Sequence, residues 1–288
     1  MWWRAFLFLT AMALAGSAQD APYAVEKVLG NFQFAGGVAW MRDHLLISDT
    51  PAGKIKKIDS DGPSVFKEEF YASGMTSDSE GRLYICDPRE HRLLRLDSKK
   101  NKQDVLADKF EGKRLNGPTA VAVSKNNHIW FTDAAFASAD REKALAHYGV
   151  YHISPKGELT LLSKMPGRPN GIALSTDQKT LYVVDSDSRS VLAWDVDRSG
   201  VAANPRVLFR VKQGVPNGIA AGADGKVYVA ARIIEVYDRT GKFDSQIELS
   251  EKPGDLTFGD VDLSNLYVAA RTSVYRVRFH NNKGGKSN

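Results

Sequence analysis

Two asparagines occupy matching positions in a repeated motif of this sequence. Pro-Asn-Gly stands at Asn170, within RPNGIALS (168–175), and again 47 residues later at Asn217, within VPNGIAAG (215–222). A single copy would indicate a turn, because Asn and Gly tolerate left-handed backbone angles and Pro restricts the residue before it. Two copies at the head of apolar runs indicate a structural repeat. Such a repeat would place two carboxamide oxygens, which are hard ligands of the kind that Ca²⁺ takes, at equivalent positions.

The elements that would position these side chains recur at the period of about 40 to 50 residues that is typical of a propeller blade. Each unit has a short apolar run, a polar turn and a second apolar run, which is the pattern of a β-hairpin. Most units continue into a third alternating run, such as KIKKID or VLAWDV, and several into a fourth. The hairpins are GGVAWMRDHLLISD, SGMTSDSEGRLYICD, TAVAVSKNNHIWFTD, NGIALSTDQKTLYVVD, NGIAAGADGKVYVAA and DLTFGDVDLSNLYVAA. We therefore predict an all-β, six-bladed β-propeller with four-stranded blades.

The propeller is expected to lie between an export signal and a polar tail. Residues 1–18 carry one basic residue, Arg4, before an apolar stretch that ends in small residues, which is typical of a secretory signal peptide. Residues 19–280 are expected to form a single domain, and residues 281–288 a flexible tail. The run YAVEKVLGNF precedes the first hairpin and is expected to add the outer strand of the last blade, which would close the ring.

Composition narrows the class of protein. The chain has 288 residues, 43% hydrophobic and 25% charged, which is ordinary for a globular domain. Its net charge of +5 is spread along the sequence without an aromatic-studded basic stripe, so no nucleic-acid partner is expected. Cys86 is the single cysteine and forms no intrachain disulfide. With the signal peptide, these features favour a secreted or periplasmic protein without stable membrane insertion after cleavage; the oligomeric state stays open.

In a propeller, the first residue of each inner strand lies at one mouth of a central channel. The repeats place Asn170, Asn217 and Asp255 there, and we predict that these three bind a divalent metal, with calcium the best match. The remaining inner strands contribute Gly36, Ser73 and Thr119. A small-molecule substrate or ligand is expected in this channel.

The next turn on the same face carries acidic residues in some blades and arginines in others. The acidic residues are Asp49, Asp87, Asp133 and Asp185. Asp133, Asp185 and Asp255 are candidates for activating water, and the candidates for binding substrate are Thr119, Arg232, Arg271 and His147. An Asp at a strand end often bonds its own turn instead, which we favour for Asp49 and Asp87 and leave open for Asp133 and Asp185. His147 ends the longest departure from the repeat, residues 133–147, which is a short helix, a lid or a tolerated surface loop.

Several of these segments together resemble the senescence marker protein, gluconolactonase and regucalcin family. They are FQFAGGVAW, KRLNGPTAVAV with HIWFTD, RPNGIALSTDQKTLYVVD, VPNGIAAGADGKVYVAA and DLTFGDVDLSNLYVAARTSVYRVRF, in the family's order, over roughly residues 23–279. The resemblance implies a six-bladed propeller, a divalent ion, usually calcium, in the channel, and hydrolysis of lactones or related esters. Asn170 matches the family's metal-binding Asn. The family has Glu where this chain has Gly36, Asp where it has Asn217, and Asn where it has Thr119.

These replacements leave the function open between different classes. One hypothesis is a secreted lactonase in which a metal polarises the ester carbonyl and an Asp activates water. An alternative is a ligand- or protein-binding propeller whose metal site has degenerated, since exchanging Glu for Gly removes a ligand and exchanging Asp for Asn removes a charge and a base. A third, a metal-free acid–base enzyme like strictosidine synthase, would depend on His147.

Overall fold

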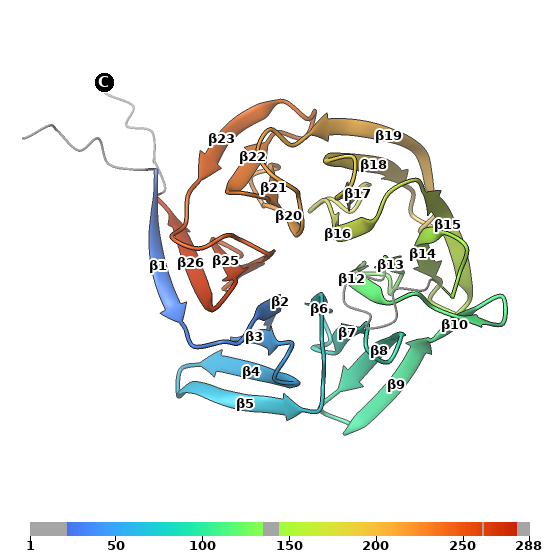
Figure 1. The fold of residues 1–288 in the computed structure, drawn as a ribbon, viewed down its shortest axis with the longest axis horizontal. Coiled ribbons are helices and arrows are strands. Elements are labelled where there is room, and N and C mark those ends of the chain that lie inside the picture. The colour runs from blue at the N-terminus through green and yellow to red at the C-terminus, as the bar shows by residue number, and fades with distance from the viewer. Residues whose placement is uncertain (1–21, 135–143, 261, 281–288) are drawn as a thin grey trace, which may run out of the picture.

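The computed structural model describes residues 22–134, 144–260 and 262–280. Within these ranges the chain forms six antiparallel four-stranded sheets around a common centre, as Figure 1 shows. The first blade consists of β2(Ala35–Met41), β3(His44–Asp49), β4(Lys54–Asp59) and β5(Gly62–Glu68). The second consists of β6(Met75–Ser77), β7(Leu83–Asp87), β8(Arg92–Asp97) and β9(Lys102–Ala107). The third consists of β12(Pro118–Val123), β13(Ile129–Asp133), β14(Tyr148–Ile153) and β15(Leu159–Met165). The predicted all-β, six-bladed propeller is confirmed.

The chain continues around the ring in the same order. The fourth blade consists of β16(Pro169–Leu174), β17(Thr180–Asp185), β18(Ser190–Val196) and β19(Ala202–Arg210). The fifth consists of β20(Ile219–Ala221), β21(Val227–Ala230), β22(Ile234–Tyr237) and β23(Phe243–Ile247). The sixth consists of β24(Asp255–Gly259), β25(Asn265–Ala270), β26(Ser273–Phe279) and β1(Tyr23–Leu29). A small hairpin of β10(Lys109–Phe110) and β11(Lys113–Arg114), which the sequence did not indicate, connects the second and third blades.

The N-terminal strand completes the sixth blade, as predicted. Strand β1 pairs antiparallel with β26, with Tyr23 opposite Phe279 and Lys27 opposite Tyr275. In Figure 1 these two strands lie side by side at the edge of the ring. The first and last strands of the domain therefore belong to one sheet, and the pairing covers the edge that β26 would otherwise expose.

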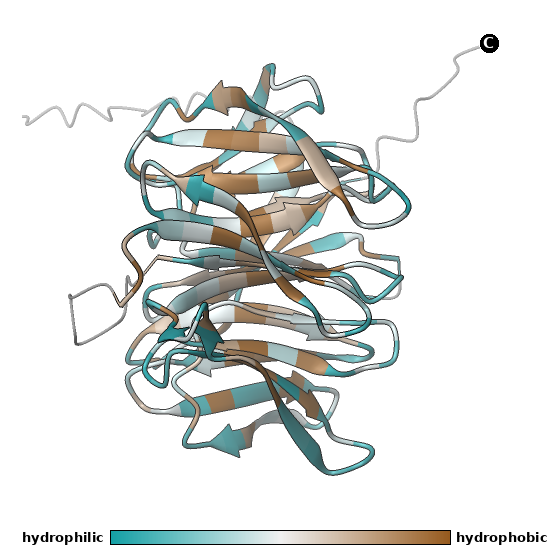
Figure 2. Cartoon of the chain, turned by 90° about the vertical axis from the view of Figure 1, so that its right-hand side faces the viewer, coloured by the Kyte–Doolittle hydropathy of each residue, from teal (hydrophilic) through white to brown (hydrophobic). Residues whose placement is uncertain are grey.

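The hydrophobic core lies between neighbouring blades. Each of the core clusters formed by the described residues combines side chains from two adjacent sheets; one joins Tyr84 and Leu93 to Phe131, and another joins Tyr228 to Leu266. The second strand of a blade is covered on both faces, which explains its continuous apolar runs, and every residue of β7 is buried. Figure 2 shows apolar segments within the strands and hydrophilic residues in the turns.

Cys86 is buried in the core between the second and third blades, where burial raises the pKa of its thiol. None of the described residues forms a helix long and apolar enough to cross a membrane. The predicted signal peptide and C-terminal tail lie outside the described residues. The predicted insert begins after β13 and ends before β14, and most of it also lies outside the described residues.

Candidate functional site

The inner strands bring the first residues of successive blades together around the axis. Backbone and side-chain hydrogen bonds connect each blade to the next at this end of the channel, which we call the mouth. The connections are Thr50 Oγ1 to Ala72 O (2.7 Å), Gly74 N to Thr119 O (2.7 Å), Thr132 Oγ1 to Asn170 O (2.7 Å), Gly171 N to Asn217 O (2.9 Å), Gly218 N to Gly254 O (2.8 Å) and Val38 N to Asp255 Oδ2 (3.1 Å). Side chains at these positions are thereby held on a continuous ring.

The glycines of the two Pro-Asn-Gly motifs are required by close approach between blades. A Cβ added to Gly171 would lie 2.5 Å from the carbonyl oxygen of Asn217, and one added to Gly218 would lie 2.7 Å from Asp255 Oδ1. Both distances are shorter than van der Waals contact. The repeated motif therefore packs the segments that carry Asn170, Asn217 and Asp255 against one another. Asn217 N donates to Ala230 O and Gly254 N donates to Ala269 O, so Gly254 takes the repeat position of the two asparagines and Asp255 stands one residue further along its strand. That the three side chains bind one metal stays a prediction.

The two asparagines differ in how they are held. Asn170 is buried, and its Nδ2 donates to Ser186 Oγ at 3.2 Å, which fixes the plane of the carboxamide and leaves Oδ1 as an acceptor. The Ser186 hydroxyl in turn donates to the carbonyl oxygen of Pro216 at 2.8 Å, immediately before Asn217. Asn217 itself is partly exposed. One serine thus positions both Pro-Asn-Gly segments.

Asp255 combines a position deep in the molecule with access to the channel. Its carboxylate accepts a hydrogen bond from the Val38 N–H at 3.1 Å, and the residue is partly exposed. Burial raises the pKa of this carboxyl group to about 6, against the lowering effect of hydrogen bonds from the Val38 and Leu256 amides. A carboxyl group with such a pKa is mostly ionised at neutral pH and remains able to take up a proton.

The axial channel itself is a cavity of about 360 Å³ lined by residues of all the inner strands, from Val38 to Asp255. Its walls are mostly small or aliphatic, and its opposite end is bordered by turn residues that include Lys125 and Gln178. Among the described residues that line it, Asp255 is the single acidic side chain. The channel therefore concentrates one negative charge in largely apolar surroundings.

The candidate carboxylates of the surrounding turns are engaged by backbone amides. Asp133 is fully buried and accepts hydrogen bonds from the N–H groups of Asn116 (2.8 Å) and Gly117 (2.6 Å). Burial raises its pKa to about 6, although both amides lower it. Asp185 is also buried and accepts from the amides of Asp187 (3.0 Å) and Ser188 (3.1 Å). Both side chains hold loops at the mouth, which is the role that the sequence favoured for Asp49 and Asp87.

Asp49 and Asp87 hold turns in the same way. Asp49 accepts from the amides of Gln33 (3.0 Å) and Phe34 (3.2 Å). Asp87 accepts from the amide of Glu90 at 3.3 Å and from the guanidinium of Arg92. Blade five lacks an acidic residue at this position of its second strand, and Glu235 on β22 accepts from the loop amides instead. The strand-end carboxylate is thus a recurring loop anchor.

The predicted substrate-binding residues are spread around the mouth. The Thr119 hydroxyl is buried and donates to the carbonyl oxygen of Gly117 at 3.2 Å. His147 Nε2 lies 3.3 Å from the Tyr151 hydroxyl, and burial lowers its pKa, with a further contribution from Lys164. Arg232 and Arg271 are exposed in the turns of the fifth and sixth blades. Of these residues, the arginines are the ones free to reach toward an anionic group at the mouth.

Sequence reasoning missed Asn116. The side chain of this buried residue holds the C-terminal end of the insert: its Nδ2 donates to the carbonyl oxygen of His147 (2.9 Å), and its Oδ1 accepts from the Leu145 amide (3.0 Å). It also missed the hydroxyls of Thr50, Thr132 and Ser186, which connect blades. The available signal was a hydroxyl residue next to the strand-end Asp, in ISDT, FTD and VDS.

Gly36 shows how the mouth is filled where a larger residue is absent. A Cβ at this position would lie 2.1 Å from Thr50 Oγ1 and 3.0 Å from Ser48 Oγ. Thr50 cannot rotate away freely, because its hydroxyl donates to the carbonyl oxygen of Ala72. The volume that a Glu side chain would enter is therefore occupied by two hydroxyls.

The donor set fits a weakly held hard cation. Asn170, Asn217 and Asp255 supply oxygen ligands of the type that Ca²⁺ uses, but with one negative charge, and calcium affinity rises with the number of charged ligands. The described residues contain no group of three or more His, Cys, Asp or Glu side chains arranged to hold a metal. Any ion at the mouth would therefore rely on carboxamide, carbonyl and water oxygens for most of its coordination.

Fold and mouth together define a six-bladed propeller with an axial site. The family model described as SMP-30/Gluconolactonase/LRE-like region matches residues 34–272, and the chain belongs to this family. A gluconolactonase from Zymomonas mobilis is 27% identical over 90% of this chain and 82% of its own length. Regucalcin from Xenopus laevis is 39% identical, over 35% of this chain and 36% of its own.

Solved structures agree on the fold. A gluconolactonase from Xanthomonas campestris superposes with a TM-score of 0.83 at 24% identity, covering 90% of both chains. A calcium-binding regucalcin from Agrobacterium tumefaciens gives a TM-score of 0.74 at 18% identity, covering 90% of this chain and 94% of that one. The resemblance expected from the sequence is thereby confirmed, and the chain is a gluconolactonase-like propeller.

Proposed function

We propose that this protein is an exported, metal-assisted hydrolase of a lactone or related ester. The observation that carries the proposal is Asp255, the single acidic side chain among the described residues of the channel, packed against Gly218 of the second Pro-Asn-Gly motif in a propeller of the gluconolactonase family. A lactone is opened when water attacks the carbonyl carbon and a base removes a proton from that water. Asp255 is the base with access to the channel.

The side chains at the mouth would have different roles in hydrolysis. The Asp255 carboxylate takes the proton from water and returns it to the ring oxygen as the C–O bond breaks. Asn170 and Asn217 orient the substrate or hold the metal through their carboxamide oxygens. A divalent cation such as calcium, when bound, polarises the ester carbonyl. Arg232 and Arg271 reach polar substituents from the rim, and Thr119 and His147 remain candidates for contacting the substrate.

Titration calorimetry with Ca²⁺, paired with a screen of small lactones, tests the proposal. The wild-type protein should bind calcium and hydrolyse at least one lactone, and both properties should be lost in Asn170→Ala. A matched control is Asn126→Ala, because Asn126 is an exposed asparagine in the turn between β12 and β13, at the end of the hairpin far from the mouth. Calcium binding and turnover that survive in Asn170→Ala would contradict the proposed site.

A binding propeller with a degenerated metal site is the second candidate. One observation favours it: Thr50 and Ser48 occupy the space beside Gly36, so the mouth has been rebuilt around the absence of a side chain there. This candidate predicts no calcium uptake and no turnover over the whole lactone panel. The metal-free acid–base alternative predicts instead turnover that persists in excess chelator and is lost in His147→Ala.

Export is tested separately from activity. The proposal assigns residues 1–18 as the signal peptide, so a chain lacking them should remain in the cytoplasm of an expressing bacterium while the full chain is found outside it. Export of the truncated chain would contradict this assignment and would leave the proposed chemistry untouched.

A further inference from the structure

A second cavity, separate from the mouth, lies between the fifth and sixth blades. It has a volume of about 590 Å³, and the aromatic rings of Tyr228, Phe258 and Phe279 contribute to its wall. The Tyr228 ring centroid is 5.1 Å from that of Phe258 and 5.8 Å from that of Phe279. The polar part of the lining includes turn residues between inner and second strands, such as Asp224, so the cavity lies toward the face opposite the mouth. Its size is within the range of small-molecule sites.

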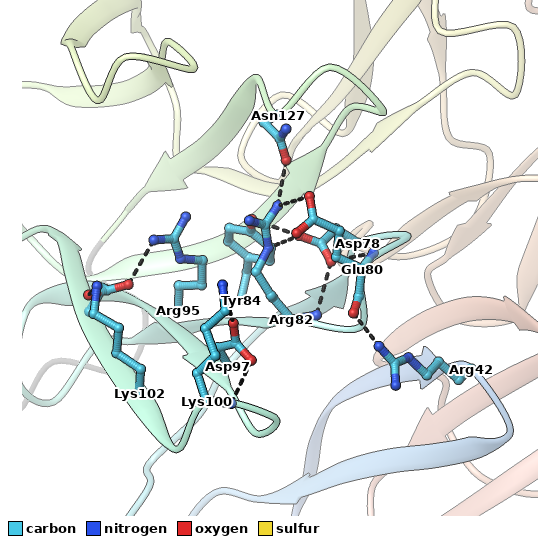
Figure 3. Close-up of polar contacts among 11 residues, drawn as sticks. Arg42, Asp78, Glu80, Arg82, Tyr84, Arg95, Asp97, Lys100, Lys102 and Asn127 are labelled. Carbon is cyan, nitrogen blue, oxygen red and sulfur yellow. Dashed lines mark hydrogen bonds and ion pairs between the residues drawn. The ribbon is translucent and has the colours of Figure 1, made fainter.

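The equivalent place in the second blade is filled by an arginine of the protein itself. Arg82 Nε donates to Asp78 Oδ2 at 2.5 Å, and Arg82 Nη2 donates to Asn127 Oδ1 of the third blade, also at 2.5 Å. The Tyr84 hydroxyl donates to the same Asp78 oxygen at 3.0 Å. Figure 3 shows the guanidinium of Arg82 between Asp78 and Asn127. The Asp78 carboxylate thus accepts both from a tyrosine hydroxyl and from a guanidinium. We call this hydrogen-bonded aspartate and tyrosine the acceptor pair.

The fifth blade repeats the acceptor pair. The Tyr228 hydroxyl donates to Asp224 Oδ2 at 2.8 Å, and the Lys226 amide donates to Asp224 Oδ1 at 3.0 Å. The same two bonds join Tyr84 and the Arg82 amide to Asp78 in the second blade.

A glycine lets the Asp224 carboxylate take this place. The repeat position of Asp78 is Gly222 in the fifth blade, and a Cβ there would lie 2.4 Å from Asp224 Oδ1. The carboxylate of Asp224 therefore occupies the space that the Asp78 side chain fills in the second blade.

The second and fifth blades differ in the basic side chain beside the acceptor pair. The repeat position of Arg82 is Lys226, and this lysine turns outward to Asp244 on β23, with Nζ 2.8 Å from Oδ2. Asp224, Asp244 and Asp262 all line the cavity, while its one lysine, Lys226, is already paired. The fifth blade therefore presents the acceptor pair to a cavity with excess negative charge.

We propose that this cavity binds a small organic cation, a guanidinium or ammonium group attached to a flat apolar body. The cation takes the place beside Asp224 and Tyr228 that the Arg82 guanidinium takes beside Asp78 and Tyr84. Guanidinium groups bind carboxylates and stack on aromatic faces, and aromatic rings attract cations through their quadrupole. The apolar body packs against Phe258, Phe279 and the aliphatic side chains of the wall. This site is distinct from the mouth and does not depend on the proposed hydrolase activity.

A series of probes that differ only in charge tests the proposal. The full chain is titrated at pH 7 with 2-phenylethylguanidinium, the neutral 2-phenylethanol and the anionic phenylacetate. The cation should bind at least about tenfold more tightly than the neutral probe, because a charge-assisted hydrogen bond to a carboxylate is stronger than a neutral one, and the anion should not bind. Amide NMR shifts should change at Lys226 and Asn265, which line the cavity. Equal affinity for all three probes would overturn the proposal.

Matched variants locate the charge effect. Asp224→Asn keeps an acceptor for the Tyr228 hydroxyl. It should weaken binding of 2-phenylethylguanidinium by about tenfold or more and leave binding of 2-phenylethanol unchanged. Asp177→Asn removes the same charge from an exposed turn of the fourth blade and should leave cation binding at the wild-type level. Equal weakening in both variants would show a nonspecific effect of net charge and would contradict the site. Because Asp224 lies outside the mouth, lactone turnover should be the same in Asp224→Asn and wild type, whatever the outcome for the proposed hydrolase.

Discussion

Asp133 and Asp255 are two carboxyl groups with the same raised pKa of about 6 and different surroundings. Asp133 at the rim accepts hydrogen bonds from two loop amides and is inaccessible to solvent. Asp255 at the axis accepts from Val38 and faces the channel. The comparison teaches that a perturbed pKa alone does not identify a catalytic acid or base. The number of lone pairs left free, and what they face, separates a loop anchor from a group that can handle a proton.

The largest expected effect is on catalysis at the axial carboxylate. Asp255→Asn should lower kcat/KM for the best lactone by at least about 100-fold, because the amide can accept the Val38 N–H but cannot take a proton from water. The melting temperature should change little. Asp133→Asn is the comparison variant and should retain much more activity; equal losses in both variants would mean that the two carboxylates do not differ in the way proposed.

The next effect is on stability at the rim. Asp133→Ala leaves two buried amides without an acceptor and should lower the free energy of unfolding by about 2–4 kcal/mol, measured by urea denaturation. Asp238→Ala is a matched control, because Asp238 also accepts from two amides, those of Thr240 and Lys242, in a turn where water can replace it. Its cost should stay below about 1 kcal/mol. Equal losses of unfolding free energy in the two variants would show that burial does not determine how much such a carboxylate stabilises the fold.

The shared pKa predicts a common pH dependence. A carboxyl group with a pKa of about 6 in the folded protein, against a model value of 3.8, holds its proton more tightly when folded. Between these values the folded state carries more protons than the unfolded state, so the stability contributed below pH 3.8 is lost as the pH rises through about 6. Relative to Asp255→Asn or Asp133→Asn, the wild type should lose about 1–3 kcal/mol over this window. Parallel stability curves for wild type and variants would contradict the raised pKa.

The smallest effect concerns the charge of the mouth. Asn217→Asp adds a carboxylate on the segment next to the one that carries Asp255 and should tighten calcium binding by about tenfold, measured calorimetrically at pH 7, because affinity follows the number of charged ligands. Gly36→Glu should not give the same gain, because Thr50 and Ser48 occupy its space. A gain from Gly36→Glu that matches Asn217→Asp would show that these hydroxyls move aside easily.

The fold could be predicted from the sequence because its information is periodic. Each hairpin repeats the same alternation of apolar and polar residues. The run before the first hairpin had no blade of its own, which predicted that it would pair with β26 of the last blade. The same periodicity predicted that the segments carrying Asn170, Asn217 and Asp255 lie on neighbouring inner strands. These conclusions depend on register and not on side-chain conformation.

The details of the candidate site and of the second cavity depended on the direction of side chains, which the repeat does not determine. The sequence placed Asp133 at the end of a second strand and Asp255 at the start of an inner strand, but it did not indicate that loop amides occupy the oxygens of Asp133. The occupation of the space at Gly36 depends on the rotamer of Thr50. Likewise, Arg82 turns into the gap between blades while Lys226 turns away toward Asp244, although they stand at the same repeat position.

The pairing of β1 with β26 also sets the order in which the molecule can be assembled. The strand that leaves the ribosome early has its partner among the last residues of the domain, with Tyr23 opposite Phe279. Until translation reaches that point, the sixth sheet is incomplete and strand edges on both sides of the gap are unprotected. Contacts this distant in sequence form slowly. The nascent chain therefore passes through a prolonged open stage in which a chaperone can engage it before it becomes a finished domain.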